Sequence, residues 1–485
     1  MRERAASPEY DAIVVGSGPN GLAASVRLAR SGYSVLVCER NPTVGGGCTT
    51  TELTLPGFRH DVCSAVHPLG AGSPFFRELP LAEHGLHWLH SEAPLAHPLA
   101  DGRPIFLERD VDGTARQFDR DAAAWRGLMG PLVEAWDNLG PQILGPLRIP
   151  RNPVTLARFG LRALRSAKGL AESWFDGQGA RSLFAGMAGH ALLPLDRSPS
   201  AAFGLVLGLA GHVIGWPIPR GGAQRLTDAL ASLLLAHGGE ILTGAEVLSL
   251  DELPRSRVVL LDLTPRRVLA VAGERLPTGY RRRLERYRYG PGVFKVDYAL
   301  DGPIPWRNPE CTRAVTVHLG GTAEEIYAGE EAVGRGEVPR RPLVLLTQPT
   351  LVDPSRAPAG KHVAWTYCHV PAGCPVDMTG SIEDQLERYA PGFRDRVLAR
   401  SRMGPAAYEA HNPNMVGGDI TGGTQDLGQL LTRPVARLNP YSTPFSGLFL
   451  CSSATPPGGA VHGMCGYFAA LAAERALARG VAIGR

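Results

Sequence analysis

The chain has 485 residues, of which 44% are hydrophobic and 20% are charged, and its formal net charge is only +4. This balance is typical of a globular protein with enough apolar material for two or three domains. Nearly all the positive residues are arginines. They form no long basic run, which argues against a nucleic-acid partner.

Cysteine spacing and apolar runs bear on the cellular location of the protein. The eight cysteines form no C-x-x-C pair, which argues against a zinc site or a redox-active dithiol and favours a reducing, cytoplasmic location. Residues 1–10 are too polar for a signal peptide, and no run reaches the roughly 18 apolar residues of a membrane span. Residues 201–216 come closest. We interpret them as a buried helix, with the wall of a substrate tunnel or a peripheral membrane contact as alternatives.

The beginning of the chain predicts a β-α-β unit. Asp11–Val15 is a short apolar run, typical of a buried parallel strand. The glycine-rich sequence 16–21 follows it and opens an amphipathic helix that ends near Gly32. A second strand over 34–37 then leads to Glu39.

The middle of the chain alternates between helical and nucleotide-binding patterns. Helices interrupted by proline and glycine are expected from about residue 73 to 216. A second nucleotide-binding segment follows, with a helix over 223–237, a strand over 240–242 and further strands around Val247 and over 258–263.

The last part of the chain predicts a sheet and then a return to the nucleotide-binding pattern. Apolar alternation of period two begins at residue 292, and strand-like runs continue to about 370. A helix is expected from Ser381, where Asp384 completes a capping-box pair. A strand over 447–451 and a helix over 467–479 close the chain.

Three glycine-rich stretches carry the cofactor chemistry. Gly16-x-Gly18-x-x-Gly21 lets the backbone approach a pyrophosphate at a helix N-terminus, and Glu39 is placed to accept hydrogen bonds from a ribose, which disfavours NADP. Gly45–Cys48 allows close passage of the chain under a diphosphate or a flavin. In 448–474 a strand and a glycine-rich loop precede a helix, whose N-terminus favours the N1/O2 edge of a flavin.

These stretches carry a family resemblance. Asp11–Gly70, Arg220–Leu230 and Leu448–Glu474 together resemble the phytoene desaturase-like branch of FAD oxidoreductases. Tyr289–Trp306 and Asn412–Gly423 are similar to the subgroup that includes pyridine nucleotide-disulphide oxidoreductase domain-containing protein 2. The resemblance covers nearly the whole chain. It implies an α/β fold in which a split Rossmann-type FAD-binding domain, like that of flavin amine oxidases and phytoene desaturases, carries an inserted α+β substrate domain.

The expected domains are discontinuous. Residues 1–72, 217–285 and 430–485 form the FAD-binding domain, and residues 73–216 and 286–429 form the substrate domain, with a helical part and an antiparallel sheet. By resemblance, specific residues are expected to bind FAD. Those residues are Gly16, Ser17, Gly18, Asn20, Gly21, Glu39, Arg40, Gly46, Gly47, Cys48, Val247 at the end of an inserted strand, Ser453, Gly458, Gly459, Val461, His462 and Met464.

Three residues are candidates for catalysis. Lys295 lies on a strand similar to the one in flavin amine oxidases whose lysine reaches flavin N5 through a water; the alternative is a pairing with Asp297. His67 and His462 lie in loops expected beside the flavin and are candidate proton donors or acceptors. The alternative for both is a histidine satisfied by the backbone. Asp419 is a further candidate base, or a turn-forming aspartate.

The expected function is FAD-dependent dehydrogenation of a hydrophobic small molecule, with hydride transfer to flavin N5 and reoxidation by oxygen or a quinone. Three alternatives stay open. A non-redox flavin isomerase would need no electron acceptor. An amine oxidase is favoured by Lys295 and disfavoured by Met464, which falls at a position of the aromatic cage. A flavoprotein with an interaction or assembly role would hold FAD that no small molecule reduces. The oligomeric state is left open.

Overall fold

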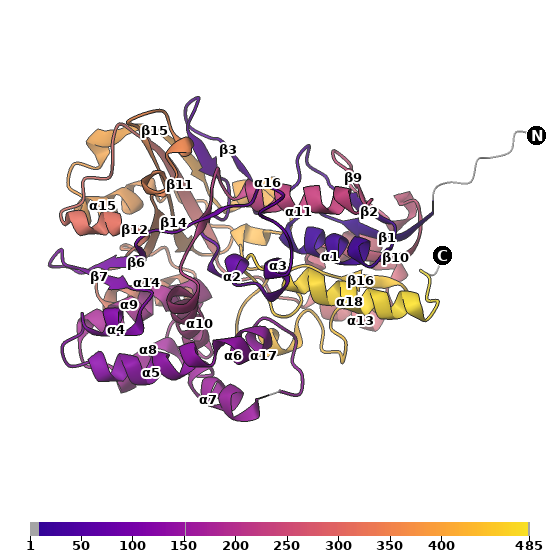
Figure 1. Cartoon of the computed structure of the whole chain (residues 1–485), viewed down its shortest axis with the longest axis horizontal. Helices are drawn as coiled ribbons and strands as arrows, with labels where there is room; N and C mark the ends of the chain where they lie inside the picture. The colour runs from indigo at the N-terminus through magenta and orange to yellow at the C-terminus, as the bar shows by residue number, and fades with distance from the viewer. Residues whose placement is uncertain (1–8, 151, 484–485) are drawn as a thin grey trace, which may run out of the picture.

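Five parallel strands build the sheet that carries the glycine-rich loop. In the computed structural model, which describes residues 9–150 and 152–483, their order is β16-β10-β1-β2-β9. The sheet joins segments from the beginning, middle and end of the chain (Figure 1). The strands are β1 (Glu9–Val15), β2 (Val35–Cys38), β9 (Glu240–Leu242), β10 (Arg255–Leu261) and β16 (Leu448–Leu450).

Both faces of this sheet are covered, which explains why its strands are apolar throughout. Ala12 and Val14 of β1 share a core with α1 (Pro19–Arg30), α11 (Gln224–Ala236) and α18 (Met464–Ala478). Ile13 and Val15 point to the other face, where they share a core with α12 (Pro265–Ala272) and α13 (Thr278–Glu285). Helices α1 and α18 touch backbone to backbone, because a Cβ at Gly466 would overlap Asn20 O.

A seven-stranded mixed sheet forms the second part of the molecule. Its order is β15-β11-β14-β13-β12-β6-β7, with β12 and β6 parallel and the other neighbours antiparallel. The sheet therefore draws strands from both expected insertions. The strands are β6 (Ala93–Pro98), β7 (Pro104–Leu107), β11 (Gly292–Leu300), β12 (Ala314–Leu319), β13 (Val344–Thr347), β14 (His362–Val370) and β15 (Val397–Met403).

Helices cover the two faces of the seven-stranded sheet. One face packs on a helical layer that lies below it in Figure 1, and the opposite face packs on α15 (Thr379–Tyr389). The helical layer contains α4 (Val111–Ala115), α5 (Ala122–Glu134), α6 (Trp136–Ile143), α7 (Pro153–Ala163), α8 (Ala167–Trp174), α9 (Gln178–Ala188), α10 (Ser200–Val213) and α14 (Ala323–Gly334).

Short elements connect these layers. The hairpin β3–β4 extends from the dinucleotide-binding part towards the seven-stranded sheet, and β5 pairs with β8. These elements are β3 (Thr50–Glu52), β4 (Arg59–Asp61), α2 (Pro68–Ala71), α3 (Pro74–Arg77), β5 (Trp88–Leu89), β8 (Ile218–Pro219), α16 (Pro405–His411) and α17 (Leu427–Thr432).

The structure departs from the sequence-based expectations at several places. Segment 73–216, expected to be helical, also supplies β5, β6 and β7. Val247 lies in a loop, because β9 is only three residues long and the chain turns at Gly244 (φ +67°). Helix α15 begins at Thr379 rather than Ser381, since Asp377 accepts a hydrogen bond from Thr379 N; Asp384 bonds Arg394 and forms no capping box. Helix α18 begins three residues earlier than expected, directly after the glycine-rich loop.

The dinucleotide-binding core extends beyond residue 72. Phe75 and Phe76 of α3 and Leu79, Leu81 and Leu86 pack in the same core as α1 and α18. These residues therefore pack with the five-stranded sheet and its helices, although the expected FAD-binding segment ends at residue 72.

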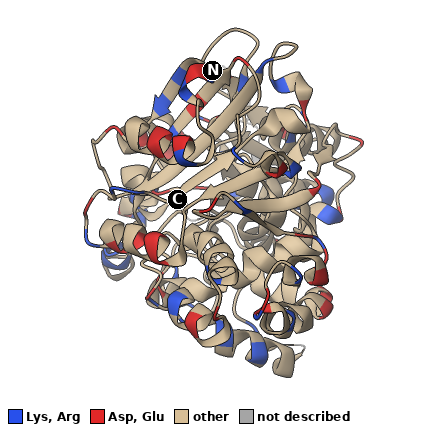
Figure 2. Cartoon of the chain, turned by 90° about the vertical axis from the view of Figure 1, so that its left-hand side faces the viewer, with Lys and Arg blue, Asp and Glu red and all other residues tan. Residues whose placement is uncertain are grey.

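Surface charge and helix length bear on the possible partners. Figure 2 shows Lys and Arg mixed with Asp and Glu over helices and loops, with no single-signed face in that view. Within residues 9–150 and 152–483, none of the helices combines the length and the apolar character that a bilayer crossing demands. The polar stretch 1–8, which predicts no signal peptide, lies outside the described residues.

Candidate functional site

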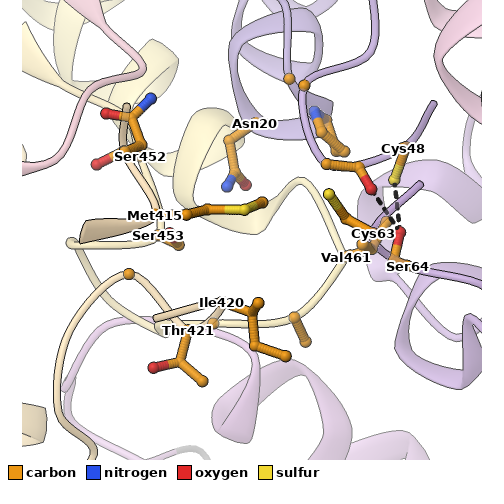
Figure 3. Close-up of a pocket in the computed structure, with 18 of the residues that line it drawn as sticks. Asn20, Cys48, Cys63, Ser64, Met415, Ile420, Thr421, Ser452, Ser453 and Val461 are labelled. Atoms are coloured by element: carbon orange, nitrogen blue, oxygen red, sulfur yellow. Dashed lines mark hydrogen bonds between the residues drawn. The ribbon is translucent and has the colours of Figure 1, made fainter. Parts of the chain in front are cut away.

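A cavity of about 600 Å³ runs between the two sheets. Loops that follow β1, β2, β10 and β16 line one part of it, as expected for a parallel sheet, which binds ligands beyond the carboxyl ends of its strands. Strands β12, β13 and β14 and helix α10 line the other part. Figure 3 shows Asn20 and Ser452 from the first part, with Met415, Ile420 and Val461 around the same space.

The glycine-rich loop is built for close backbone contacts. Gly16 has a φ of +100°, which favours glycine, and a Cβ at Gly21 would overlap Gly16 O. A Cβ at Gly46 would lie 3.0 Å from Gly18 Cα, so the second glycine-rich stretch passes directly against the first. Gly16, Gly18 and Gly46 line the cavity, whereas Gly21 lies behind them. Side chains at Gly16 and Gly18 would meet Asp262, so glycine is needed there for the loop to lie this close to the end of β10.

The Glu39 carboxylate bonds to the glycine-rich loop through Ser17. Its Oε2 accepts hydrogen bonds from Ser17 N (2.9 Å) and Ser17 Oγ (2.6 Å), and its Oε1 accepts one from Asn41 N (2.8 Å). Glu39 is buried yet lines the cavity, so its remaining lone pairs can accept from a ribose. Neighbouring Arg40 donates to Ala410 O (3.1 Å) at the end of α16 and thereby holds the loop after His411 across this end of the cavity.

Asp262 is a site residue that the sequence analysis missed. It follows β10 directly, and its Oδ2 accepts a hydrogen bond from Gly21 N (3.0 Å) at the start of α1. Burial, together with the nearby Glu39 carboxylate, raises the pKa of Asp262 to about 7. Its position at the carboxyl end of a predicted strand was the available signal.

The C-terminal loop lines the cavity opposite the glycine-rich loop. Ser453, Gly459, Val461 and His462 contribute to the lining, whereas Gly458 and Met464, which we also expected to contact the cofactor, do not. Met464 instead packs in the core beneath α18, because it already belongs to the first turn of that helix.

Arg433 holds the C-terminal loop in place. It is buried and donates to Ser453 O (3.2 Å), and a Cβ at Gly458 would overlap its guanidinium group. The arginine therefore fixes the backbone of the loop while lying outside the cavity lining. The sequence gives no periodic or motif signal for this role.

Both expected loop histidines border the cavity and are neutral. Burial lowers the pKa of His67 to about 4 and that of His462 to about 4. His462 Nδ1 accepts a hydrogen bond from Met464 N (3.0 Å). His67 Nε2 lies 3.1 Å from Ser64 Oγ, and its Nδ1 has no hydrogen-bond partner among the described residues. Ser64 also lies 3.2 Å from Cys48 Sγ (dashed in Figure 3), and burial raises the pKa of that thiol to about 12.

Lys295 is not among the described residues that line the cavity. Its ammonium group is fully buried and lies 2.5 Å from Asp297 Oδ2, which is the pairing considered as the alternative to a flavin contact. Burial raises the pKa of Asp297 to about 6, against the opposing effect of Lys295. His60 Nδ1 lies 3.7 Å from the other oxygen of Asp297.

The substrate-domain part of the cavity is largely apolar. Helix α10 presents Ala202, Phe203, Val206 and Leu207 to it, at the helical spacing that places residues on one face. The segment 201–216 is thus a helix that also forms a cavity wall. His190 joins this wall, and burial, followed by the effect of His369, lowers its pKa to about 3. Asp419 is committed to turn contacts, with its carboxylate accepting from Gly290 N and Thr421 N.

The residues at the first part of the cavity fit the diphosphate and ribose of FAD. Glycines at 16, 18 and 46 leave bare backbone at the cavity, and the N-terminus of α1 lies at the same place. Asn20 Oδ1 is buried without a hydrogen-bond partner among the described residues, and it faces this space. Glu39 retains acceptor capacity for ribose hydroxyls.

Known proteins agree with this arrangement. A family model described as an NAD(P)-binding Rossmann-like domain matches residues 14–79. Pyridine nucleotide-disulfide oxidoreductase domain-containing protein 2 of Rattus norvegicus is 29% identical, over 96% of this chain and 93% of its own length. A phytoene dehydrogenase of Streptomyces griseus is 25% identical, over 81% and 78%.

Solved structures share the fold. An engineered putrescine oxidase superposes with a TM-score of 0.63 at 18% identity, covering 97% of this chain and 99% of that one. These similarities confirm the expected fold class, and the residues of the cradle fit FAD, the expected cofactor.

Proposed function

We propose that this chain is an FAD-dependent oxidoreductase of the phytoene desaturase and amine oxidase type, and that it desaturates a hydrophobic small molecule. The observation that carries the proposal is the continuity of one cavity from the glycine cradle to the apolar face of α10. Bound FAD supplies an oxidant that takes a hydride at flavin N5. A proton leaves the neighbouring substrate carbon, a carbon–carbon double bond forms, and oxygen or a quinone accepts the electrons.

His67 is the better placed of the two loop histidines to accept that proton. Both rings are neutral at pH 7, since burial holds each pKa near 4. His462 Nδ1 is already engaged by Met464 N, whereas His67 Nδ1 has no partner among the described residues. The apolar wall positions the substrate and excludes water.

The test is anaerobic mixing of the FAD-loaded protein with panels of polyenes, polyketide-like molecules and amines, followed by the visible flavin spectrum. We expect bleaching by a polyene or polyketide-like compound, and recovery of the spectrum when oxygen or a quinone is admitted. Bleaching by amines alone would replace the proposal with amine oxidation. A substrate that is converted while the flavin needs no acceptor would identify an isomerase.

A surface beside the cavity supports a contact with anionic membranes, through which an apolar substrate can arrive. We propose that this surface comprises Leu147, Ile149 and the outward face of α7, which lies at the edge of the molecule (Figure 1). Leu147 is 80% exposed, Ile149 93% and Leu161 76%. Exposed Arg148, Arg158 and Arg165 accompany them and would attract acidic headgroups.

The other side of the same segment reaches the cavity. Ile143 and Leu144 at the end of α6 and Phe159 of α7 line it. An apolar molecule leaving a bilayer at this surface would therefore meet the cavity wall. The membrane contact and the hydrophobic substrate are thus two parts of one proposal.

Sedimentation with lipid vesicles tests this surface. We expect the protein to bind phosphatidylglycerol vesicles more strongly than phosphatidylcholine vesicles. The change Leu147→Ser with Ile149→Ser should lower binding by about tenfold or more, because each side chain loses a favourable transfer into the lipid. Leu438→Ser is the matched control, since Leu438 is fully exposed elsewhere. Equal loss in both variants, or no binding by the wild type, would reject the contact.

A further inference from the structure

Three polar side chains form a row across the wall of the cavity. Thr316 of β12 lies directly opposite Thr347 of β13, and Thr347 lies directly opposite Trp365 of β14. Directly opposed residues of neighbouring antiparallel strands point to the same face of a sheet. All three residues line the cavity, so the row faces the substrate space.

The row carries hydrogen-bonding groups that the protein does not use. Thr316 Oγ1, Thr347 Oγ1 and Trp365 Nε1 are buried and have no hydrogen-bond partner among the described residues. The three residues are only 4%, 2% and 8% exposed. Buried polar groups are nearly always paired, so three adjacent unpaired groups that face one cavity indicate a place for a ligand.

The neighbouring row extends this polar wall without adding charge. His318 lies opposite Leu345, which lies opposite Tyr367, and His190 Nε2 lies 3.2 Å from His318 Nε2. His190 and Tyr367 line the cavity. Burial holds the pKa of His190 and of His318 far below neutrality, so both rings are uncharged.

The charged side chains near this wall are already bonded to other groups of the protein. No Lys, Arg or Glu of the described residues 73–216 and 286–429 lines the cavity, and the single aspartate there, Asp419, is bonded to backbone N–H groups and to Thr421. On the next strand, β11, Lys295 lies opposite Tyr367 and Asp297 lies opposite Trp365, but Lys295 and Asp297 pair with each other. An ionised amine or carboxylate would thus enter this wall without a counter-charge, at a large desolvation cost.

We propose that this row binds a neutral oxygen group, a hydroxyl or a carbonyl, at one end of an otherwise apolar substrate. Trp365 Nε1 donates only, while the threonine hydroxyls donate and accept, so both oxygen groups can be satisfied. A pure hydrocarbon would leave all three groups unpaired. The inference rests on the proposed function for the identity of the cavity as a substrate site, and it narrows the substrate to an oxygenated apolar molecule.

Equilibrium binding to the FAD-loaded protein tests the inference without turnover. The probes are farnesene, farnesol, farnesal, farnesoate and farnesylamine, which share one apolar chain and differ in the end group. Farnesol or farnesal should bind at least tenfold more tightly than the other three. Thr316→Val and Thr347→Val should each remove about tenfold of that preference, which corresponds to one lost hydrogen bond, and leave farnesene binding unchanged.

Thr366→Val is the matched control. Thr366 is buried next to Trp365 in β14, but it points to the other face and donates to Val296 O (2.9 Å). It should leave all five affinities unchanged. The inference would be overturned if farnesene bound as tightly as farnesol, or if the tightest binder were charged. Equal loss of farnesene and farnesol binding in the valine variants, or no binding of any probe, would also overturn it. Tight farnesol binding without any reducible substrate would instead contradict the proposed desaturation.

Discussion

The two parts of the cavity recognise their ligands in different ways. The cofactor part is made of backbone, with glycines 16, 18 and 46 in close contact and with the acids Glu39 and Asp262 beside them. The substrate part is made of side chains from α10 and the seven-stranded sheet, and it carries unpaired polar groups without free charge. Backbone contacts can bind a cofactor that many proteins share. Side chains differ between proteins, so the side-chain wall is the part that can select a substrate.

The largest expected effect concerns the paired charges behind the substrate wall. Lys295→Met leaves the Asp297 carboxyl buried without its cation, which should destabilise the protein by roughly 3–5 kcal/mol when that carboxyl is charged. The pKa of Asp297 is already raised to about 6, so the carboxyl takes up a proton as pH falls. The loss should therefore be large at pH 8 and smaller at pH 5, as measured by urea unfolding.

The double variant Lys295→Met with Asp297→Leu distinguishes a structural role of Lys295 from a role in flavin reoxidation. It should recover most of the stability, and its bound flavin should be reoxidised by oxygen at the wild-type rate. A well-folded double variant with slow reoxidation would restore Lys295 to the flavin site and would contradict a substrate part without free charge.

A smaller effect is expected in the cofactor part. Glu39→Ala removes a charged acceptor for the ribose, so FAD binding should weaken by roughly 1.5–3 kcal/mol, or about ten- to a hundredfold. FAD retained after dialysis, measured by absorbance, reports the change. The variant also frees Ser17 N, so unfolding in the absence of FAD should be measured beside it. Wild-type flavin retention would remove Glu39 from the site.

The difference between the two parts also explains what the sequence could reveal. Gly16, Gly18 and Glu39 are local to one β-α-β unit, so their spacing alone predicts the cradle. Asp262 lies 241 residues from Gly21 and reaches the same place only because β10 pairs with β1, which no local motif encodes.

The substrate wall was still harder to predict. Thr316, Thr347 and Trp365 come together through the register of three strands, which no single segment encodes. For Lys295 the resemblance favours a flavin contact and the spacing favours a pairing with Asp297, and in the structure Asp297 on the same strand face holds the ammonium group. The apolar run 201–216 predicts a buried helix, and in the structure residues 201–213 lie in α10, which also lines the cavity.

The most direct test of the account is a single anaerobic turnover of the FAD-loaded protein, with the flavin spectrum and the mass of the product measured together. We predict that one equivalent of an oxygenated apolar substrate bleaches the flavin and yields a product lighter by two hydrogen atoms, with a new carbon–carbon double bond. A product of unchanged mass, or conversion that leaves the flavin oxidised, would contradict desaturation.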